Sequence, residues 1–221
     1  IKSYFGQLNP KTEKKEGLGI QVLKDGSIYE GEYQNGKQNG KGRLVTEDKI
    51  YCGQWSKGKA TGKGILKDLP SNTMIKGTFT DLKPYGKCLK SHSNGSAFSG
   101  NFINGIISGL GKYNWEDGSS YTGNFESGLQ DGKGKYIDPK GNIYEGEFKD
   151  NKYNGKGKMK MKNGTSYKGF FENGKRHGKG ICQWPDGRFY DGNWADDEMN
   201  GVGTFKDVDG RERRGKFNKG K

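Results

Sequence analysis

The chain has 221 residues and a formal net charge of +13, and only 29% of its residues are apolar. Its mean hydropathy of −1.07 is too low for an ordinary globular domain, yet its 12% aromatic content and 40 glycines against 5 prolines are not typical of disorder. No apolar run is long enough to cross a membrane, and three scattered cysteines with two histidines exclude a disulfide framework or a zinc site of familiar spacing.

An aromatic-x-Gly-x-aromatic pattern divides the chain into repeats. Residues 1–28 form a degenerate repeat that begins at Tyr4, residues 29–213 hold eight full repeats, and residues 214–221 begin a further repeat or a cap. The full repeats start at Tyr29, Tyr51, Ile75, Phe98, Tyr121, Tyr144, Tyr167 and Tyr190. A fixed step of 22 to 24 residues is the signature of a repeat protein.

Inside each repeat the pattern has a period of two, which predicts β-strands. In one repeat, Tyr121, Gly123 and Phe125 share one face, and six residues, 126–131, predict the connection to a second strand. Pairs such as Asp117-Gly118 predict the turn to the next repeat, because they supply positive φ at low cost.

Glycines recur two, eleven and thirteen residues after the start of each repeat, with Cys88 as the exception in the last set. Placed beside the rings, they let each ring lie flat over a glycine and let rings of successive hairpins form one row. One hairpin cannot bury its apolar face alone, but a stack can. We therefore predict an all-β fold: an elongated single-layer antiparallel sheet of tandem β-hairpins, with about eight full repeats and partial ones at both ends.

Two segments carry a family resemblance. Residues 51–64 read YCGQWSKGKATGKG, and residues 167–180 read YKGFFENGKRHGKG. They resemble the repeat of the MORN (membrane occupation and recognition nexus) family, and the resemblance covers about Tyr29 to Phe217. MORN arrays occur in junctophilins, in radial spoke proteins of cilia, in cytoskeletal proteins of protists, and beside lipid kinase or SET methyltransferase domains. The resemblance implies attachment and scaffolding, and leaves the target open.

The repeat from Ile75 departs most from the pattern. Leu82 replaces a loop glycine, Cys88 replaces a paired glycine, and Pro70 lies just before the repeat. Two interpretations are open: a kink or bulge over residues 68–84, or sequence drift without geometric effect.

No catalytic constellation is evident. His177 lies in a predicted loop without the partners of a triad. Sequences such as Gly132-Lys133-Gly134 recur in a strand context and open no helix, so a dinucleotide-binding loop is not predicted. We expect a non-enzymatic protein without a cofactor or a metal ion.

The aromatic residues form the first candidate site. In structural terms they are the core; in functional terms they line a groove that can accept a partner segment. Trp115 and Trp184 share the ring face and are candidate anchors near its rim. The candidate partner groove comprises Tyr33, Trp55, Phe79, Phe102, Trp115, Phe125, Phe148, Phe171, Trp184 and Trp194.

A basic stripe on the opposite face forms the second candidate site. It contacts anionic lipid or an acidic partner, or it is simply a solvated face that nearby acidic residues partly neutralise. Leu110 and Val202 interrupt it. Its members are Lys41, Lys63, Lys87, Lys133, Lys156 and Lys179.

The leading functional hypothesis is a protein-interaction scaffold that binds a helical or extended partner segment along the aromatic-lined groove. The expected setting is cytoplasmic, in a cytoskeletal or ciliary assembly. One alternative is a peripheral membrane tether that binds anionic phospholipid through the basic stripe. Another is the regulatory arm of an enzyme domain outside this sequence, since the chain begins at Ile1 and we expect it to be part of a longer protein. Nucleic acid ranks last, and an open strand edge permits an edge-mediated dimer.

Overall fold

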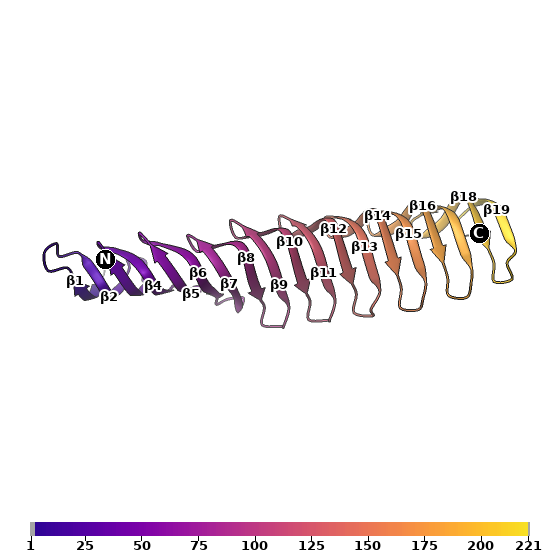
Figure 1. The fold of residues 1–221 in the computed structure, drawn as a ribbon. Helices are drawn as coiled ribbons and strands as arrows, with labels where there is room; N and C mark the ends of the chain where they lie inside the picture. Colours follow the sequence, from indigo (N-terminus) through magenta and orange to yellow (C-terminus); the bar gives the residue numbers. More distant parts are fainter. Residues whose placement is uncertain (1–2, 221) are drawn as a thin grey trace. The chain divides into compact units, whose positions relative to one another are not determined.

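The computed structural model describes residues 3–220 as β-strands joined by short turns, and no helix occurs among these residues (Figure 1). Residues 1, 2 and 221 of the predicted terminal segments lie outside this range. The chain divides into two units, one ending at Ser108 and one starting at Gly109, and β10 (Ile106–Asn114) carries the boundary.

The N-terminal unit holds nine complete strands, each paired antiparallel with the next. They are β1 (Ser3–Leu8), β2 (Lys15–Val22), β3 (Ile28–Gln34), β4 (Lys37–Val45), β5 (Lys49–Ser56), β6 (Lys59–Asp68), β7 (Thr73–Thr80), β8 (Lys83–Ser91) and β9 (Ala97–Ile103). The degenerate first repeat is therefore a hairpin, β1–β2.

In the C-terminal unit, β10 pairs with β11 and the antiparallel order continues to the last strand. The strands are β11 (Ser120–Glu126), β12 (Leu129–Ile137), β13 (Ile143–Lys149), β14 (Lys152–Lys160), β15 (Ser166–Glu172), β16 (Lys175–Gln183), β17 (Phe189–Ala195), β18 (Glu198–Lys206) and β19 (Glu212–Phe217). The predicted all-β class of tandem antiparallel hairpins is confirmed.

The turn within the hairpin of each full repeat is shorter than the sequence suggested. β11 ends at Glu126 and β12 begins at Leu129, so only Ser127 and Gly128 connect them, with φ of 50° and 85°. Two successive residues at positive φ form a type I′ turn, whose twist matches that of the flanking strands. The predicted six-residue connection is wrong, because the strands continue up to this tight turn.

The extra residues form a bulge in the second strand. Gly123 pairs with Gly134 but Phe125 pairs with Gln130, so residues 131–133 lie opposite Asn124 alone. Gly132, at the centre of the bulge, has a φ of 86°, which strongly favours glycine. The equivalent glycine of every other full repeat is also at positive φ. These glycines shape the backbone rather than make room for rings.

In the connection between hairpins, the two turn residues, for example Asp117 and Gly118, have different structural roles. Gly118 adopts a φ of 84° and donates its N–H to the Trp115 carbonyl at 3.1 Å. The carboxylate of Asp117 accepts the backbone N–H of Ser119 at 2.9 Å and its hydroxyl at 2.6 Å. The acidic residue therefore stabilises the turn through its side chain, and glycine alone supplies the positive φ.

Buried rings and glycine pairs build the core of each hairpin. The ring of Tyr121 lies over Gly123 and Gly134, and its hydroxyl donates to the Asn124 carbonyl at 2.8 Å. The same ring packs edge to face on Phe125 at 5.1 Å and on Phe148 of the next hairpin at 4.9 Å. Because each first ring touches the second rings of two hairpins, the core is a zigzag of rings that links hairpins within a unit.

The Ile75 repeat keeps the register of its neighbours. Eight residues lie between the paired Leu66 and Ile75, against seven between Tyr113 and Tyr121. The loop absorbs the additional residue, and the β7–β8 pair carries only the bulge that all hairpins share. Strand pairing here fits drift without geometric effect, not a kink over residues 68–84.

Within this repeat, the side chain of Cys88 occupies the place over the glycine that a tyrosine ring has in other repeats. Its buried thiol lies over Gly77, and Sγ lies 3.7 Å from the Thr78 carbonyl. In seven other hairpins a tyrosine hydroxyl donates to the equivalent carbonyl at 2.8 to 3.3 Å. Ile75 leaves the space that the sulfur fills, so the two departures from the pattern compensate for each other.

Candidate functional site

Most of the predicted groove residues are inaccessible. Eight of the ten are at most 7% exposed, because second rings such as Phe148 are enclosed by the first rings of their own and the preceding hairpin. They are Tyr33, Trp55, Phe79, Phe102, Phe125, Phe148, Phe171 and Trp194. What a partner can reach on the ring face is therefore a second set of aromatic side chains that lies over this core.

Three half-buried rings from successive hairpins of the C-terminal unit surround a hollow on the ring face, which we call the aromatic hollow. Trp115 packs on Tyr136 with ring centroids 5.9 Å apart, and Tyr136 lies 6.4 Å from Tyr153. The hollow has a volume of about 710 Å³, and Phe125 is among the residues that line it. The structure thus brings together two of the predicted groove residues, Trp115 and Phe125.

Tyr153 is held firmly in this position. Its ring stacks on Tyr144 at 3.8 Å with an interplanar angle of 14°. Burial raises the pKa of Tyr153 to about 12, and its protonated hydroxyl can donate a hydrogen bond. One wall of the aromatic hollow is therefore a rigid ring with a polar edge.

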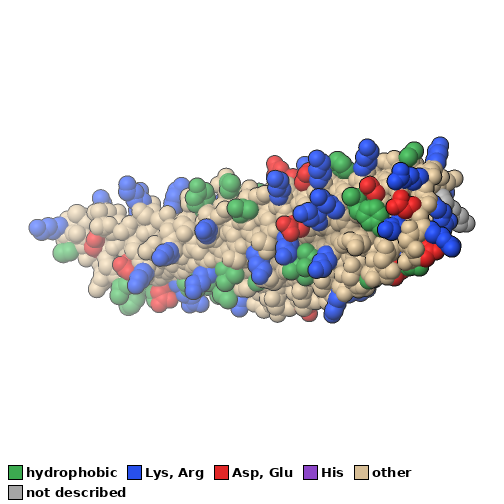
Figure 2. Space-filling view, turned by 45° about the vertical axis from the view of Figure 1, so that its right-hand side comes forward, with side chains coloured by type: hydrophobic (Ala, Val, Ile, Leu, Met, Phe, Trp, Pro, Cys, Tyr) green, Lys and Arg blue, Asp and Glu red, His purple; other side chains and the backbone are tan. Residues whose placement is uncertain are grey.

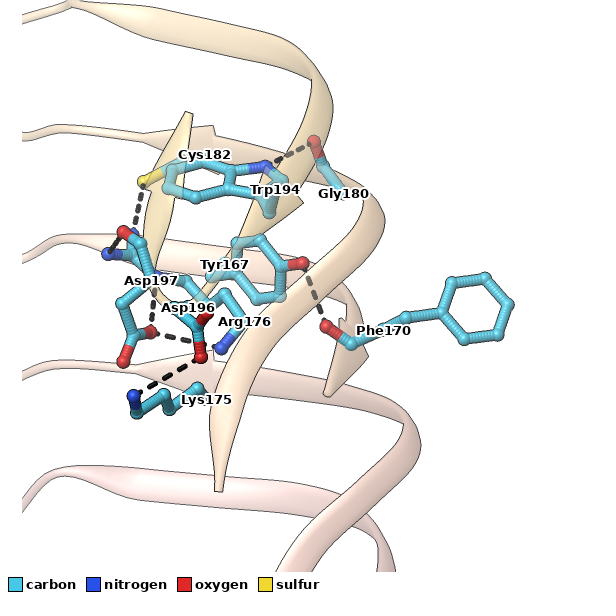
Figure 3. Close-up of polar contacts among 9 residues, drawn as sticks. All are labelled: Tyr167, Phe170, Lys175, Arg176, Gly180, Cys182, Trp194, Asp196 and Asp197. Carbon is cyan, nitrogen blue, oxygen red and sulfur yellow. Dashed lines mark hydrogen bonds and ion pairs between the residues drawn. The ribbon is translucent and has the colours of Figure 1, made fainter. Parts of the chain in front are cut away.

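Arg176 occupies the place of Tyr153 in the next hairpin (Figure 3). Its guanidinium lies 4.2 Å from the centroid of the Trp194 ring and forms an ion pair with Asp197 at 3.0 Å. The indole Nε1 of Trp194 donates to the Gly180 carbonyl at 3.0 Å. A fixed cation over the ring face therefore replaces the open ring found one hairpin earlier.

Trp184 differs from Trp115 although both begin the same kind of loop. Trp184 packs on Phe205 at 6.2 Å, and the guanidinium of Arg188 lies 5.5 Å from its ring centroid. It does not line the aromatic hollow. The two tryptophans that the sequence made equivalent thus have different surroundings.

The lysines of the basic stripe are all exposed on the face opposite the rings. In the N-terminal unit, Lys41 and Lys63 line one hollow of about 610 Å³ together with Arg43 and Glu30. Lys87 is exposed but does not line this hollow. Lysine and arginine side chains are spread over the surface shown in Figure 2, with acidic side chains between them.

In the C-terminal unit a second hollow of about 780 Å³, which we call the basic hollow, lies on this same face. Phe170 and Ile181, which the sequence analysis did not single out, form its apolar part. Phe170 was detectable, because most other repeats carry a polar residue at its position. The lysines that line the basic hollow are Lys133, Lys135, Lys156, Lys158, Lys168 and Lys179.

The described residues contain no cluster of three or more His, Cys, Asp or Glu side chains that could hold a metal ion. Nor does any helix in residues 3–220 have the length and apolar character needed to cross a membrane. His177 lies near Glu172, with Nε2 3.4 Å from a carboxylate oxygen, on a half-exposed hairpin end.

Tandem hairpins, most of them with a tyrosine over a glycine pair, define a β-repeat protein that offers surfaces on both faces. The MORN repeat model matches residues 29–49, 51–68, 98–120, 121–143, 144–166, 167–187 and 190–210. The chain therefore belongs to the MORN-repeat family. The repeat from Ile75 is not among the matched segments, in keeping with its compensated pair of substitutions.

Solved structures show a related fold at low sequence identity. The wild-type TCP10 domain of Danio rerio CPAP, in complex with a peptide of Danio rerio STIL, is 13% identical with a TM-score of 0.53, over 97% of this chain and 100% of that chain. The Drosophila melanogaster SAS-4 (dCPAP) TCP domain, in complex with a proline-rich motif of Ana2 (dSTIL), is 15% identical with a TM-score of 0.43, over 71% of this chain and 85% of that chain. No curated protein matches the chain significantly.

Proposed function

We propose that this chain is a non-enzymatic protein-interaction module that binds a segment of a partner protein in the aromatic hollow. The observation that carries the proposal is the arrangement of Trp115, Tyr136 and Tyr153. These rings come from successive hairpins and remain partly exposed around one hollow, whereas the row beneath them is buried. Aromatic side chains held rigidly at a concave surface are the residues that dominate binding energy at protein interfaces.

The shape and chemistry of the aromatic hollow indicate its occupant. Rings supply the walls, and polar side chains such as Asn151 and Lys152 lie at the hairpin ends. A helical or extended segment that inserts an aromatic or aliphatic side chain between Trp115 and Tyr153 would satisfy both parts. The related TCP10 domain was solved with a bound peptide, which supports this kind of occupant for the fold.

The proposed setting is a cytoskeletal or ciliary assembly in the cytoplasm, where the module would join two other components. Beads coated with the chain, incubated with cytoskeletal and membrane fractions of the source cell, test this part separately. Recovery of the partner from the membrane fraction alone would contradict the cytoskeletal setting.

Peptide display against the full chain tests the binding site. Peptides selected on the wild-type chain are measured by calorimetry against Trp115→Ala, Trp115→Phe and Trp184→Ala. Loss of a buried aromatic anchor should weaken binding by about thirtyfold, and phenylalanine should restore part of it. Trp184→Ala is the matched control, because its ring lies outside the aromatic hollow.

Two results would contradict the proposal. One is a set of selected peptides that bind Trp115→Ala as tightly as the wild-type chain. The other is an equal loss in Trp115→Ala and Trp184→Ala, which would point to general destabilisation. Thermal melts of each variant, followed by circular dichroism, separate lost binding from lost folding.

A further inference from the structure

The basic hollow carries more positive than negative charge. Six lysines line it against three acidic residues, Glu145, Glu147 and Asp191, which leaves an excess of three positive charges (6 − 3). None of the six lysines belongs to an ion pair among the residues that the structure describes. The basic hollow therefore presents cations that the protein itself does not neutralise by direct contact.

The excess is concentrated at β14 and β15. On one side, Lys133 lies opposite Glu147 across the β12–β13 ladder, so each charge has a counter-charge in register. On the other side, Lys158 has Glu145 opposite it on β13 but Lys168 directly opposite it on β15, where no acidic residue lines the hollow. Like charges placed opposite each other destabilise a sheet, and an anionic ligand between them would remove this repulsion.

An exposed aromatic ring lies next to this lysine pair. Phe170 is 43% exposed and Ile181 is 40% exposed, on the neighbouring strands β15 and β16. Figure 3 shows the Phe170 side chain pointing away from the core rings Tyr167 and Trp194. The ammonium nitrogen of Lys156 lies 5.6 Å from the centroid of the Phe170 ring.

The position of Phe170 makes its exposure unusual. Its side chain belongs to the residue whose carbonyl accepts the tyrosine hydroxyl, and that residue is polar in the other tyrosine-led full repeats: Glu32, Gln54, Asn124, Glu147 and Asn193. The fold therefore does not require an apolar side chain here. A phenylalanine that faces solvent among lysines is instead suited to contact a ligand.

We propose that the basic hollow binds an extended acidic segment of a partner protein, which places one apolar side chain against Phe170 and Ile181. Charge complementarity selects the acidic residues, and Phe170 selects the apolar one. From β12 to β16 the hollow crosses four strand spacings of about 4.8 Å, or roughly 19 Å, which about six extended residues span. The site lies on the face opposite the aromatic hollow and does not depend on it.

A peptide fits this geometry better than a bilayer. The lysines and Phe170 line a concave surface, so they converge on a narrow ligand. A flat layer of anionic headgroups would meet only the rims of such a surface. Anionic vesicles are therefore the competing ligand that the experiment must include.

The test uses the full chain and fluorescence anisotropy at about 150 mM salt, where only close charges interact strongly. The probe is a fluorescein-labelled peptide of about eight residues that carries Asp and Glu on both sides of one phenylalanine. Two control peptides replace the acids by their amides or the phenylalanine by alanine. Vesicles that contain phosphatidylserine are measured in parallel by co-sedimentation.

Folding of each variant is checked by circular dichroism, because Lys158→Glu places a carboxylate opposite Glu145. Lys158→Glu/Lys168→Glu reverses the paired charges, and Phe170→Asn introduces the residue that three other repeats carry at this position. Lys140→Glu/Lys162→Glu is the matched control, because both lysines are exposed in loops of the same unit and the change in net charge is identical. Trp115→Ala removes the aromatic anchor of the opposite face.

We expect the acidic peptide to bind saturably and its amide control to bind at least about tenfold more weakly. Lys158→Glu/Lys168→Glu should weaken binding by about tenfold or more, whereas the loop control should change it by less than about threefold. Phe170→Asn should weaken binding of the phenylalanine peptide by about fivefold and leave the alanine peptide unchanged. Trp115→Ala should bind as the wild-type chain does, which separates this site from the aromatic hollow.

Three outcomes would overturn the proposal. The first is the absence of saturable peptide binding at this salt concentration. The second is an equal loss of peptide affinity in Lys158→Glu/Lys168→Glu and in the loop control, which would mean that net charge alone attracts the peptide. The third is binding to vesicles that the Lys158→Glu/Lys168→Glu change abolishes while the peptides do not bind, which would assign the hollow to lipid.

Discussion

Restoring the consensus pair in the Ile75 repeat tests whether ring and glycine act as one structural element. The two perturbations are Ile75→Tyr and Cys88→Gly, made singly and together. In the consensus repeat from Tyr144, a Cβ added to Gly157 would lie 2.5 Å from the tyrosine hydroxyl oxygen. A tyrosine at the position of Ile75 and any side chain at the position of Cys88 would therefore occupy the same space.

The structure gives the expected magnitudes. Ile75→Tyr alone forces a ring against the buried Cys88 side chain, and overpacking of this kind costs about 1–3 kcal/mol. Cys88→Gly alone removes a buried side chain, leaves the Thr78 carbonyl without its sulfur partner and adds backbone freedom, at a cost of about 1–2 kcal/mol. Together they rebuild the tyrosine over a glycine pair, so the double variant should lie within about 1 kcal/mol of the wild-type chain.

Urea unfolding, followed by circular dichroism, gives the four stabilities of this double-mutant cycle. Because neighbouring repeats can unfold separately, the midpoints are compared only where the slopes agree. A coupling of at least about 1.5 kcal/mol in favour of the double variant is expected. Additive effects of the two changes would refute the reasoning, since they would show that Ile75 and Cys88 do not share the same space.

Three further measurements test other parts of the core. Gly157→Ala should destabilise the chain by about 2 kcal/mol or more because of its overlap with a tyrosine ring, whereas Gly215→Ala, where an added Cβ meets nothing within 4 Å, should change the unfolding midpoint little. Arg176→Leu should lower the free energy of unfolding by about 1 kcal/mol, because the ion pair with Asp197 and the cation over Trp194 are lost. The same change should shift the tryptophan emission to the red. Unchanged emission would contradict the contact with Trp194. Burial raises the pKa of several phenols from 10.0 to about 12, so the folded state holds these protons more tightly than the unfolded chain does. The stabilisation is complete below about pH 10 and is lost as the pH rises towards 12, which urea midpoints across this range should show as a fall above about pH 10 and a plateau below it. The phenols are those of Tyr33, Tyr121, Tyr153 and Tyr167.

The repeat and its fold class were predictable because their cause is local. A ring such as Tyr121 needs a glycine on its own strand and another on the partner strand, and this requirement leaves a sequence pattern with a fixed step. The buried state of the second rings follows from the same pattern. Strand class and core residues could therefore be inferred before any coordinates.

The turns and the hollows were not predictable to the same degree. Gly132 reads as one more glycine on the ring face, yet its positive φ belongs to a bulge that depends on the pairing partner. Trp115 and Trp184 hold equivalent places in their repeats, and only the neighbours contributed by other hairpins distinguish them. Phe170 breaks the polar pattern at its position, but its meeting with Lys156 depends on cross-strand register.

The zigzag of rings also determines how such a protein can change length. Gly134 and Tyr136 of β12 pair with Gly146 and Tyr144 of β13, and Gly169 and Tyr167 hold the same places in β15. Removing residues 144–166 would therefore join two edges that already match, and duplicating them would create the same joint again. When a gene gains or loses one such segment, the strands at the new junction can pair and pack as they did before. The number of binding positions along the array can therefore change in evolution without a new core.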